Sequence, residues 1–166
     1  MIAYRKLFRV SKQSPERELL VERAARAAAD FGAAAGAVDE QARAVLGINP
    51  TDASILAVLY EREQLTAGEA AAAIRLSPAA TSTAIQRLVA AGHLTRTPDP
   101  ADRRRAVLVL TEATRTLLAA IYEPIGDEGT ALLADYTDDE LRVVTRFLER
   151  GRALQLAHAD RVRALR

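Results

Sequence analysis

The 166-residue sequence contains no cysteine, and aromatic residues make up only 4% of it. Without cysteine the chain can form no disulfide and can sense no peroxide through a thiol. It also lacks any run of eighteen apolar residues, about the length that a membrane-spanning helix requires. Its first residues lack the apolar core and the small-residue cleavage site of a secretion signal. We therefore expect neither membrane insertion nor export, and a cytoplasmic protein.

The net charge of the whole chain is small, but one segment has a clear excess of positive charge. The formal net charge is only +1, yet residues 77–111 contain five arginines and two aspartates, a local excess of three positive charges. Focused basicity of this kind is typical of a defined contact with an anionic partner. Hydrophobic residues reach 49% and alanine about a fifth of the chain, which favours helices and a core but provides few bulky side chains. Oligomerisation would supply the missing burial.

Residues 66–92 carry the start and stop signals of two short helices. Thr66 and Glu69 form a capping-box pattern, and Ser77 followed by Pro78 is a second helix start. Only two residues are left for a turn before Ser77. The second helix ends near Gly92, which can adopt the left-handed conformation. Its apolar residues recur at helical spacing and are expected in the core: Ala84, Ile85, Leu88 and Val89. The pattern predicts a helix, a tight turn and a second helix.

An alternating pattern after this pair predicts a β-hairpin. Residues 94–96 and 107–109 have the Thr-rich and Val-rich composition of strands. Between them, residues 98–102 are rich in turn formers and include no apolar side chain large enough to bury. Three arginines, at 103–105, follow at once. The tip of the hairpin therefore projects into solvent and carries a cluster of guanidinium groups.

The second helix is expected to expose a face of small and polar side chains. Its members are Ala79, Ala80, Thr81, Ser82, Thr83 and Gln86. Small hydroxyl side chains beside a basic protrusion suit the major groove of DNA and the adjacent phosphates or minor groove. Each feature also has an ordinary explanation, since Ser and Thr are common on solvated helices and the arginines near Asp99 and Asp102 suit a soluble turn. Together the two features favour DNA binding.

Long helices are predicted on both sides of this segment. Residues 15–46 carry an apolar stripe at spacings of three and four that requires a partner helix. Residues 49–63 form a scaffold helix that begins with an Asn cap and a first-position Pro. After the hairpin, one helix begins near Thr111 and contains Pro124, and another begins at a capping box at Thr137. These helices are more than a DNA-binding module needs.

The segment DPADRRRAVLVLTEAT at 99–114 closely resembles the wing and following helix of the MarR family of winged helix-turn-helix transcription regulators. The stretch INPTDASILAVLYERE at 48–63 also lies where that family has it. The resemblance implies a mainly α fold and a homodimer that binds a pseudo-palindromic DNA site, most simply as a ligand-responsive repressor. The resemblance further implies that residues 1–166 form a single MarR-like domain. Within it, residues 49–111 would form the winged helix-turn-helix DNA-binding lobe, and residues 1–48 and 112–166 would form the dimerisation helices.

The resemblance also implies roles for individual residues. Asp102 and Arg104 are the working pair of the wing: Arg104 enters the minor groove, and Asp102 orients an arginine. Arg87 and Arg96 are candidates for phosphate contact or for pairing with Asp102. The expected DNA-binding residues are Ser77, Ala79, Ala80, Thr81, Ser82, Thr83, Gln86, Arg87, Arg96, Asp102, Arg103, Arg104 and Arg105. Family members bind small molecules between the dimerisation helices and the DNA-binding lobe, and the candidate lining residues here are Phe31, Tyr60 and Tyr122.

No motif in the sequence indicates catalysis or metal binding. The two histidines, His93 and His158, lie far apart in the sequence and are interpreted as structural. No glycine-rich phosphate loop, nucleophile elbow or zinc motif occurs, so we expect no enzyme activity and no cofactor.

Two alternatives stay open. The chain has a second possible function, as a winged-helix dimerisation or partner-binding module that does not bind DNA, although the basic hairpin argues against it. The basic and partly apolar residues 1–14 are interpreted as packing on a partner subunit rather than as a DNA-contacting arm.

Overall fold

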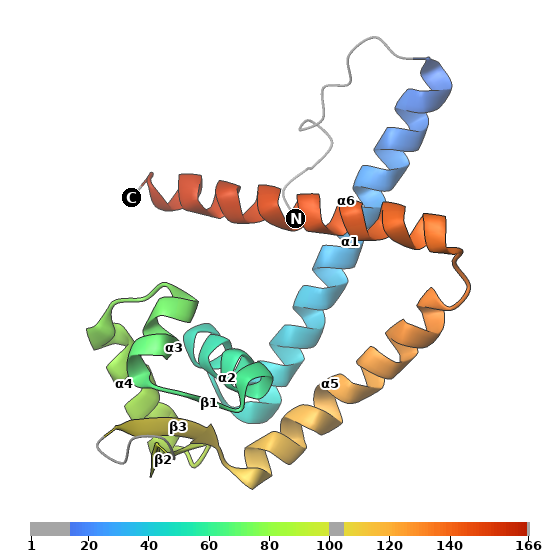
Figure 1. Cartoon of the computed structure of the whole chain (residues 1–166). Coiled ribbons are helices and arrows are strands. Elements are labelled where there is room, and N and C mark those ends of the chain that lie inside the picture. The colour runs from blue at the N-terminus through green and yellow to red at the C-terminus, as the bar shows by residue number, and fades with distance from the viewer. Residues whose placement is uncertain (1–13, 100–104, 166) are drawn as a thin grey trace. The chain divides into compact units, whose positions relative to one another are not determined.

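The computed structural model describes residues 14–99 and 105–165, and within them six helices and three short strands (Figure 1). Along the chain they are α1 (Pro15–Leu46), α2 (Pro50–Arg62), β1 (Gln64–Leu65), α3 (Ala67–Ile74), α4 (Pro78–Ala90), β2 (Leu94–Pro98), β3 (Ala106–Leu110), α5 (Glu112–Leu133) and α6 (Asp138–Arg163). The chain forms two compact units, Met1–Thr111 and Glu112–Arg166. The expectation of a mainly α fold with a winged helix-turn-helix is confirmed.

Short connections determine where α1 ends and where α2 begins. Gly47 follows α1 in the left-handed conformation, with φ of 66°, which residues with a side chain rarely adopt. Asn49 then caps α2, because its Oδ1 accepts a hydrogen bond of 3.0 Å from the backbone N–H of Asp52. Pro50 occupies the first helical position, where its missing N–H costs no hydrogen bond. Only three residues, 47–49, therefore separate the end of α1 from the start of α2.

The two helices α3 and α4 begin at the caps that the sequence predicts. Thr66 Oγ1 accepts from the backbone N–H of Glu69 (3.2 Å), and the Glu69 carboxylate accepts from the N–H (2.7 Å) and the hydroxyl (2.6 Å) of Thr66. Ser77 Oγ accepts from the N–H of Ala80 (3.2 Å) and starts α4. The turn between the helices contains Arg75 in the left-handed conformation, with φ of 53°. A Cβ is strained there, so the tight turn is achieved at a local cost.

The two strands that follow α4 form a three-stranded antiparallel sheet with β1, which precedes α3, in the order β1-β3-β2. In the predicted hairpin, Arg96 lies opposite Leu108, and the N–H of Asp99 donates a 2.9 Å hydrogen bond to the carbonyl of Arg105. The strand β1 was not predicted, because two residues carry no readable alternation; it pairs Gln64 with Val109. The hairpin is thus anchored to the chain between α2 and α3.

The first unit has its hydrophobic core among α2, α4 and the sheet, which pack on one another. Its large apolar side chains that are at most 1% exposed are Ile55, Leu56, Leu59, Ile85, Leu88 and Leu94. Burial of each stabilises the fold by roughly 1.5–3 kcal/mol. The expectation that Val89 belongs to this core is wrong, since it is 39% exposed. Successive helical residues turn by about 100°, which carries Val89 away from the buried face that contains Leu88.

The second unit consists of α5 and α6. Pro124 lies inside α5, and α6 begins at the predicted capping box, in which the Glu140 carboxylate accepts from the N–H (2.9 Å) and the hydroxyl (2.7 Å) of Thr137. None of the described residues of α6 is buried, and apolar side chains such as Phe147 and Leu154 are more than half exposed. Along 14–99 and 105–165, no helix is long and apolar enough to cross a membrane.

The strained turn gives the first prediction. Arg75→Gly is expected to raise the free energy of unfolding by roughly 0.5–1 kcal/mol, because glycine adopts the left-handed conformation without a Cβ clash. Urea denaturation followed by circular dichroism measures the change. Arg75→Ala is the matched control, since it removes the same side chain and charge but keeps the Cβ. A glycine variant that is no more stable than the alanine variant would contradict this assignment.

The capping box at α3 gives a pH-dependent prediction. Hydrogen bonds from the Thr66 hydroxyl, and next from its backbone N–H, hold the pKa of Glu69 below its ordinary value. A carboxylate with a lowered folded-state pKa stabilises the fold above its ordinary pKa, and the contribution is lost as pH falls through the folded pKa. Glu69→Gln should therefore be less stable than the wild type near neutral pH, and the difference should shrink as the pH is lowered from about 6 to about 3.

A double-mutant cycle with Thr66→Ala is the control for this experiment. Once the Thr66 hydroxyl is gone, Glu69→Gln should have a smaller effect at neutral pH. An equal effect with and without the hydroxyl would show that Glu69 stabilises the protein by some other route.

Candidate nucleic-acid interface

The helix α4 has one buried face and one polar, exposed face. Of the residues expected on the exposed face, five are exposed: Ala79, Ala80, Ser82, Thr83 and Gln86. Thr81 is the exception, because it is only 1% exposed, and its expected place on the exposed face is wrong. Its Oγ1 donates a 3.0 Å hydrogen bond to the carbonyl of Ser77, which satisfies the hydroxyl inside the helix and permits its burial. Thr81 therefore belongs to the core.

Some polar side chains on the exposed face form hydrogen bonds within the protein, and others do not. Ser77 Oγ caps the helix, and Thr83 Oγ1 donates a 3.1 Å hydrogen bond to the carbonyl of Ala79. The side chains of Ser82 and Gln86 form no hydrogen bond with any residue that the structure describes. They are four residues apart, so their side chains lie on the same side of the helix. These two side chains retain all their donors and acceptors for a ligand.

Arg87 lies beside Gln86 and is engaged by a residue that the sequence did not single out as a partner. Its Nε donates to Asp52 Oδ2 at 2.8 Å and its Nη2 to Asp52 Oδ1 at 2.6 Å. The hydrogen bond to Asp52 raises the pKa of Arg87 above its ordinary value. The expected alternative partner of Arg87, Asp102, lies outside the described residues.

The sequence contained a signal for this pair. Asp52 precedes Ile55 and Leu56 by three and four residues, so it shares the helix face that these two core residues occupy. A carboxylate on a core-facing position requires a cationic partner. An acidic residue in the first turn of a helix also has an ordinary explanation, because it faces the positive end of the helix dipole.

The hairpin carries two arginines within the described residues. Arg96 on β2 and Arg105, directly before β3, are both exposed. The positive charge of Arg105 also contributes to the lowered pKa of Glu69, after the hydrogen bonds from Thr66, so Arg105 lies within electrostatic reach of the start of α3. The expected wing residues Asp102, Arg103 and Arg104 lie outside the described part of the chain.

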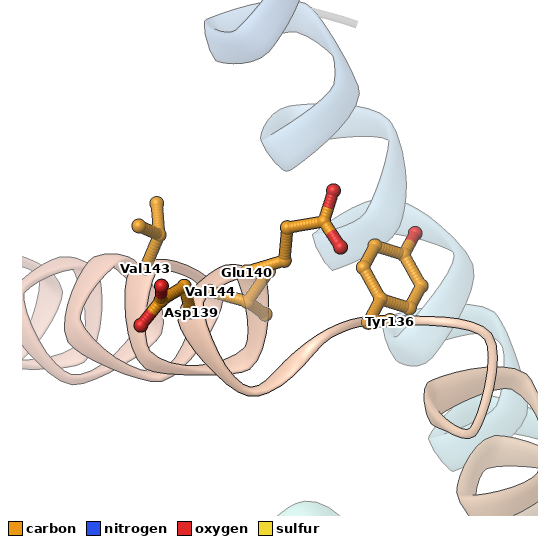
Figure 2. A pocket seen from close by; sticks show the side chains of 5 residues that line it. All are labelled: Tyr136, Asp139, Glu140, Val143 and Val144. Carbon is orange, nitrogen blue, oxygen red and sulfur yellow. The ribbon is translucent and has the colours of Figure 1, made fainter.

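The three residues expected to line a ligand site lie on three different helices. Phe31 on α1 is 68% exposed, Tyr60 on α2 is partly buried, and Tyr122 belongs to α5 in the second unit. None of them lines the open hollow of about 320 Å³ at the beginning of α6. Figure 2 shows its lining side chains, which come from the loop before α6 and from its first turns: Tyr136, Asp139, Glu140, Val143 and Val144.

His93 has a structural contact. Its Nε2 lies 3.0 Å from the carbonyl oxygen of Leu46, and because a carbonyl only accepts, the imidazole N–H donates. This bond joins the end of α1 to the start of β2. Across residues 14–99 and 105–165, no group of three or more acidic, histidine or cysteine side chains is arranged to hold a metal ion.

Comparison with known proteins agrees with this geometry. Residues 46–105 match the sequence model of the MarR family. The chain is 29% identical over 124 residues to YcgE, an uncharacterized HTH-type transcriptional regulator of Bacillus subtilis (strain 168), and the match covers 75% of this chain and 80% of YcgE.

Two crystal structures have a similar fold. The transcriptional regulator Tm0710 from Thermotoga maritima is 25% identical, with a TM-score of 0.50 over 84% of this chain and 96% of that one. A MarR family transcriptional regulator from Silicibacter pomeroyi is 23% identical, with a TM-score of 0.51 over 86% of this chain and 88% of that one. Residues 46–105, which match the family model, contain the helix-turn-helix and the first strand of the β-hairpin, so this part of the chain is similar to the winged helix-turn-helix of MarR family transcription regulators.

Proposed function

We propose that the protein is a homodimeric repressor that binds a pseudo-palindromic DNA site and responds to a small molecule. The observation that carries the DNA-binding part is the exposed face of α4, on which the side chains of Ser82 and Gln86 are unengaged, while the same helix packs on β2, which carries the exposed Arg96. A recognition helix lies in the major groove and reads base edges with two to four side chains. Responsiveness to a ligand and repression rest on the family resemblance.

In this proposal the side chains of Ser82 and Gln86 on α4 contact DNA bases, and the surrounding groups contact the sugar-phosphate backbone of the DNA. The amide of Gln86 has both a donor and an acceptor, which suits a bidentate contact with adenine in the major groove. The first turns of α4, where the walls of the DNA major groove approach the helix most closely, carry Ser77, Ala79, Ala80 and Thr83. Phosphates are held by the arginines at 87, 96, 103 and 105, while Arg104 enters the minor groove with Asp102 shaping the wing.

The proposal of a homodimer rests on the apolar side chains that the single chain leaves uncovered. Monomeric soluble proteins rarely expose large contiguous apolar surfaces. On α6 the residues Val143, Phe147 and Leu154 recur at helical spacing and are 52–62% exposed. Two copies also match the symmetry of a pseudo-palindromic site, because each subunit presents one recognition helix to one half-site.

Sequence selection from a random duplex pool tests the base-reading role. The wild type should enrich a pseudo-palindrome, and Gln86→Ala should relax preference at one base pair per half-site, because a bidentate contact discriminates by about 1–3 kcal/mol. Gln41→Ala, an exposed glutamine on α1, is the control and should select as the wild type does. Unchanged preference in Gln86→Ala would remove Gln86 from the interface, and no enrichment by the wild type would favour a partner-binding module.

Sedimentation velocity tests the dimer. The wild type should sediment at twice the chain mass, and the double variant Phe147→Glu with Leu154→Glu should dissociate, because it places charge in an apolar contact. Thr145→Glu with Ala153→Glu adds the same charge at exposed positions on the other side of α6 and should remain dimeric. A wild type that sediments as a monomer at every concentration would contradict the proposal.

A further inference from the structure

The most unusual charged group in the first unit is the carboxylate of Asp52. It lies in the first turn of α2 and is only 2% exposed, among side chains that otherwise form the hydrophobic core. Removing a carboxylate from water is costly unless a partner and hydrogen bonds replace the water. The carboxylate therefore requires Arg87, whose two hydrogen bonds occupy both of its oxygens.

The pair also determines the direction of the Arg87 guanidinium. Nε and Nη2 point at the buried carboxylate, in the bidentate geometry that fixes the plane of the group. The side chain of Arg87 is nevertheless 47% exposed, and Nη1 donates to no residue that the structure describes. A guanidinium has five N–H donors, so three remain for a ligand on the outer side. Arg87 thus presents a fixed, donor-rich edge at the border of the exposed face of α4.

We propose that Asp52 is a positioning residue, which holds Arg87 so that the outer edge of its guanidinium binds a DNA phosphate beside the recognition helix. This inference rests on the proposed DNA-binding function. A free arginine side chain must lose its rotational freedom when it binds, whereas Arg87 has already lost it in the folded protein. The guanidinium suits this role better than an ammonium, because it can engage a carboxylate and a phosphate at the same time in one plane.

The salt dependence of DNA binding distinguishes the effect of positioning Arg87 from the effect of its charge. The logarithm of affinity for duplex DNA falls with the logarithm of salt concentration, with a slope of about 0.9 for each phosphate that the protein neutralises. Removing Arg87 removes a phosphate contact and lowers the slope. Removing Asp52 leaves the positive charge in place, so the slope is kept while the affinity falls. If the Asp52 carboxylate only stabilised the fold, its removal from a protein that stays folded would change neither the slope nor the affinity.

The probe is a fluorescent mixed-sequence duplex on the order of 30 base pairs, long enough for two half-sites. Its binding is measured by anisotropy between about 50 and 200 mM salt. Arg87→Gln should reduce the slope by about 0.9 per subunit. Asp52→Asn should keep the slope but weaken binding about two- to tenfold per subunit, the factor expected when one long side chain must be immobilised on binding. Arg62→Gln, an exposed arginine at the other end of α2, is the charge-matched control and should keep the wild-type slope.

Two further variants keep the test decisive if Asp52→Asn folds poorly. Arg87→Lys retains the charge but loses the bidentate geometry, so it should behave as expected for Asp52→Asn. In the Arg87→Gln background, the Asp52→Asn change should weaken binding no further, since no side chain is left to position. Circular dichroism at the assay temperature verifies that each variant is folded.

The outcomes distinguish the inference from the function on which it rests. A wild type that does not bind the duplex would overturn both. A wild type with a steep salt dependence that Arg87→Gln leaves unchanged would overturn the phosphate contact of Arg87 alone. Unchanged or tighter binding by folded Asp52→Asn and Arg87→Lys would overturn the positioning role of Asp52.

Discussion

The burial of α2 and α4 against one another is the interaction on which the first unit depends. Ile55 and Leu59 on α2, with Ile85 and Leu88 on α4, are at most 1% exposed. A helix that commits one face to a core must present the opposite face to solvent. The side chains that anchor α4 therefore also determine that Ser82 and Gln86 are exposed. The buried face of α4 and the face proposed to read DNA thus belong to one helix, and close packing of the core limits how far that helix can rotate.

The Asp52–Arg87 pair adds a polar constraint at the edge of this apolar contact. Apolar contacts tolerate small shifts of one helix against the other. The two hydrogen bonds of 2.8 and 2.6 Å between residues 35 positions apart are directional and restrict such shifts. The pair joins α2 to α4, the helix that we propose to face DNA. The same low-dielectric surroundings that make an unpaired carboxylate costly make the orientation of its partner well defined.

The two units differ in how much of their apolar surface is buried within the single chain. The first unit buries large aliphatic side chains within itself, although its local geometry includes the strained Arg75 turn. The helix α6 is defined by strong local signals, above all the capping box of Thr137 and Glu140, yet none of its described residues is buried. A capping box determines where a helix begins but not what covers it. The apolar side chains that this 26-residue helix leaves exposed favour a contact with another surface.

The sequence by itself determined the elements whose signals are local. Caps such as Thr66 with Glu69 and the glycine at 47 act through hydrogen bonds and backbone angles a few residues apart, so the helices begin and end where they were predicted. The strand alternation likewise predicted the hairpin, and the motif at 99–114 indicated the family.

The tertiary structure decided what depends on distant partners. Thr81 is buried because its hydroxyl bonds to Ser77 and the core covers it, Val89 is exposed because it lies outside the buried face of α4, and β1 forms because β3 pairs with it. Asp52 and Arg87 meet across 35 residues, and local patterns cannot specify such a pair, because its energy comes from the folded core that surrounds the carboxylate.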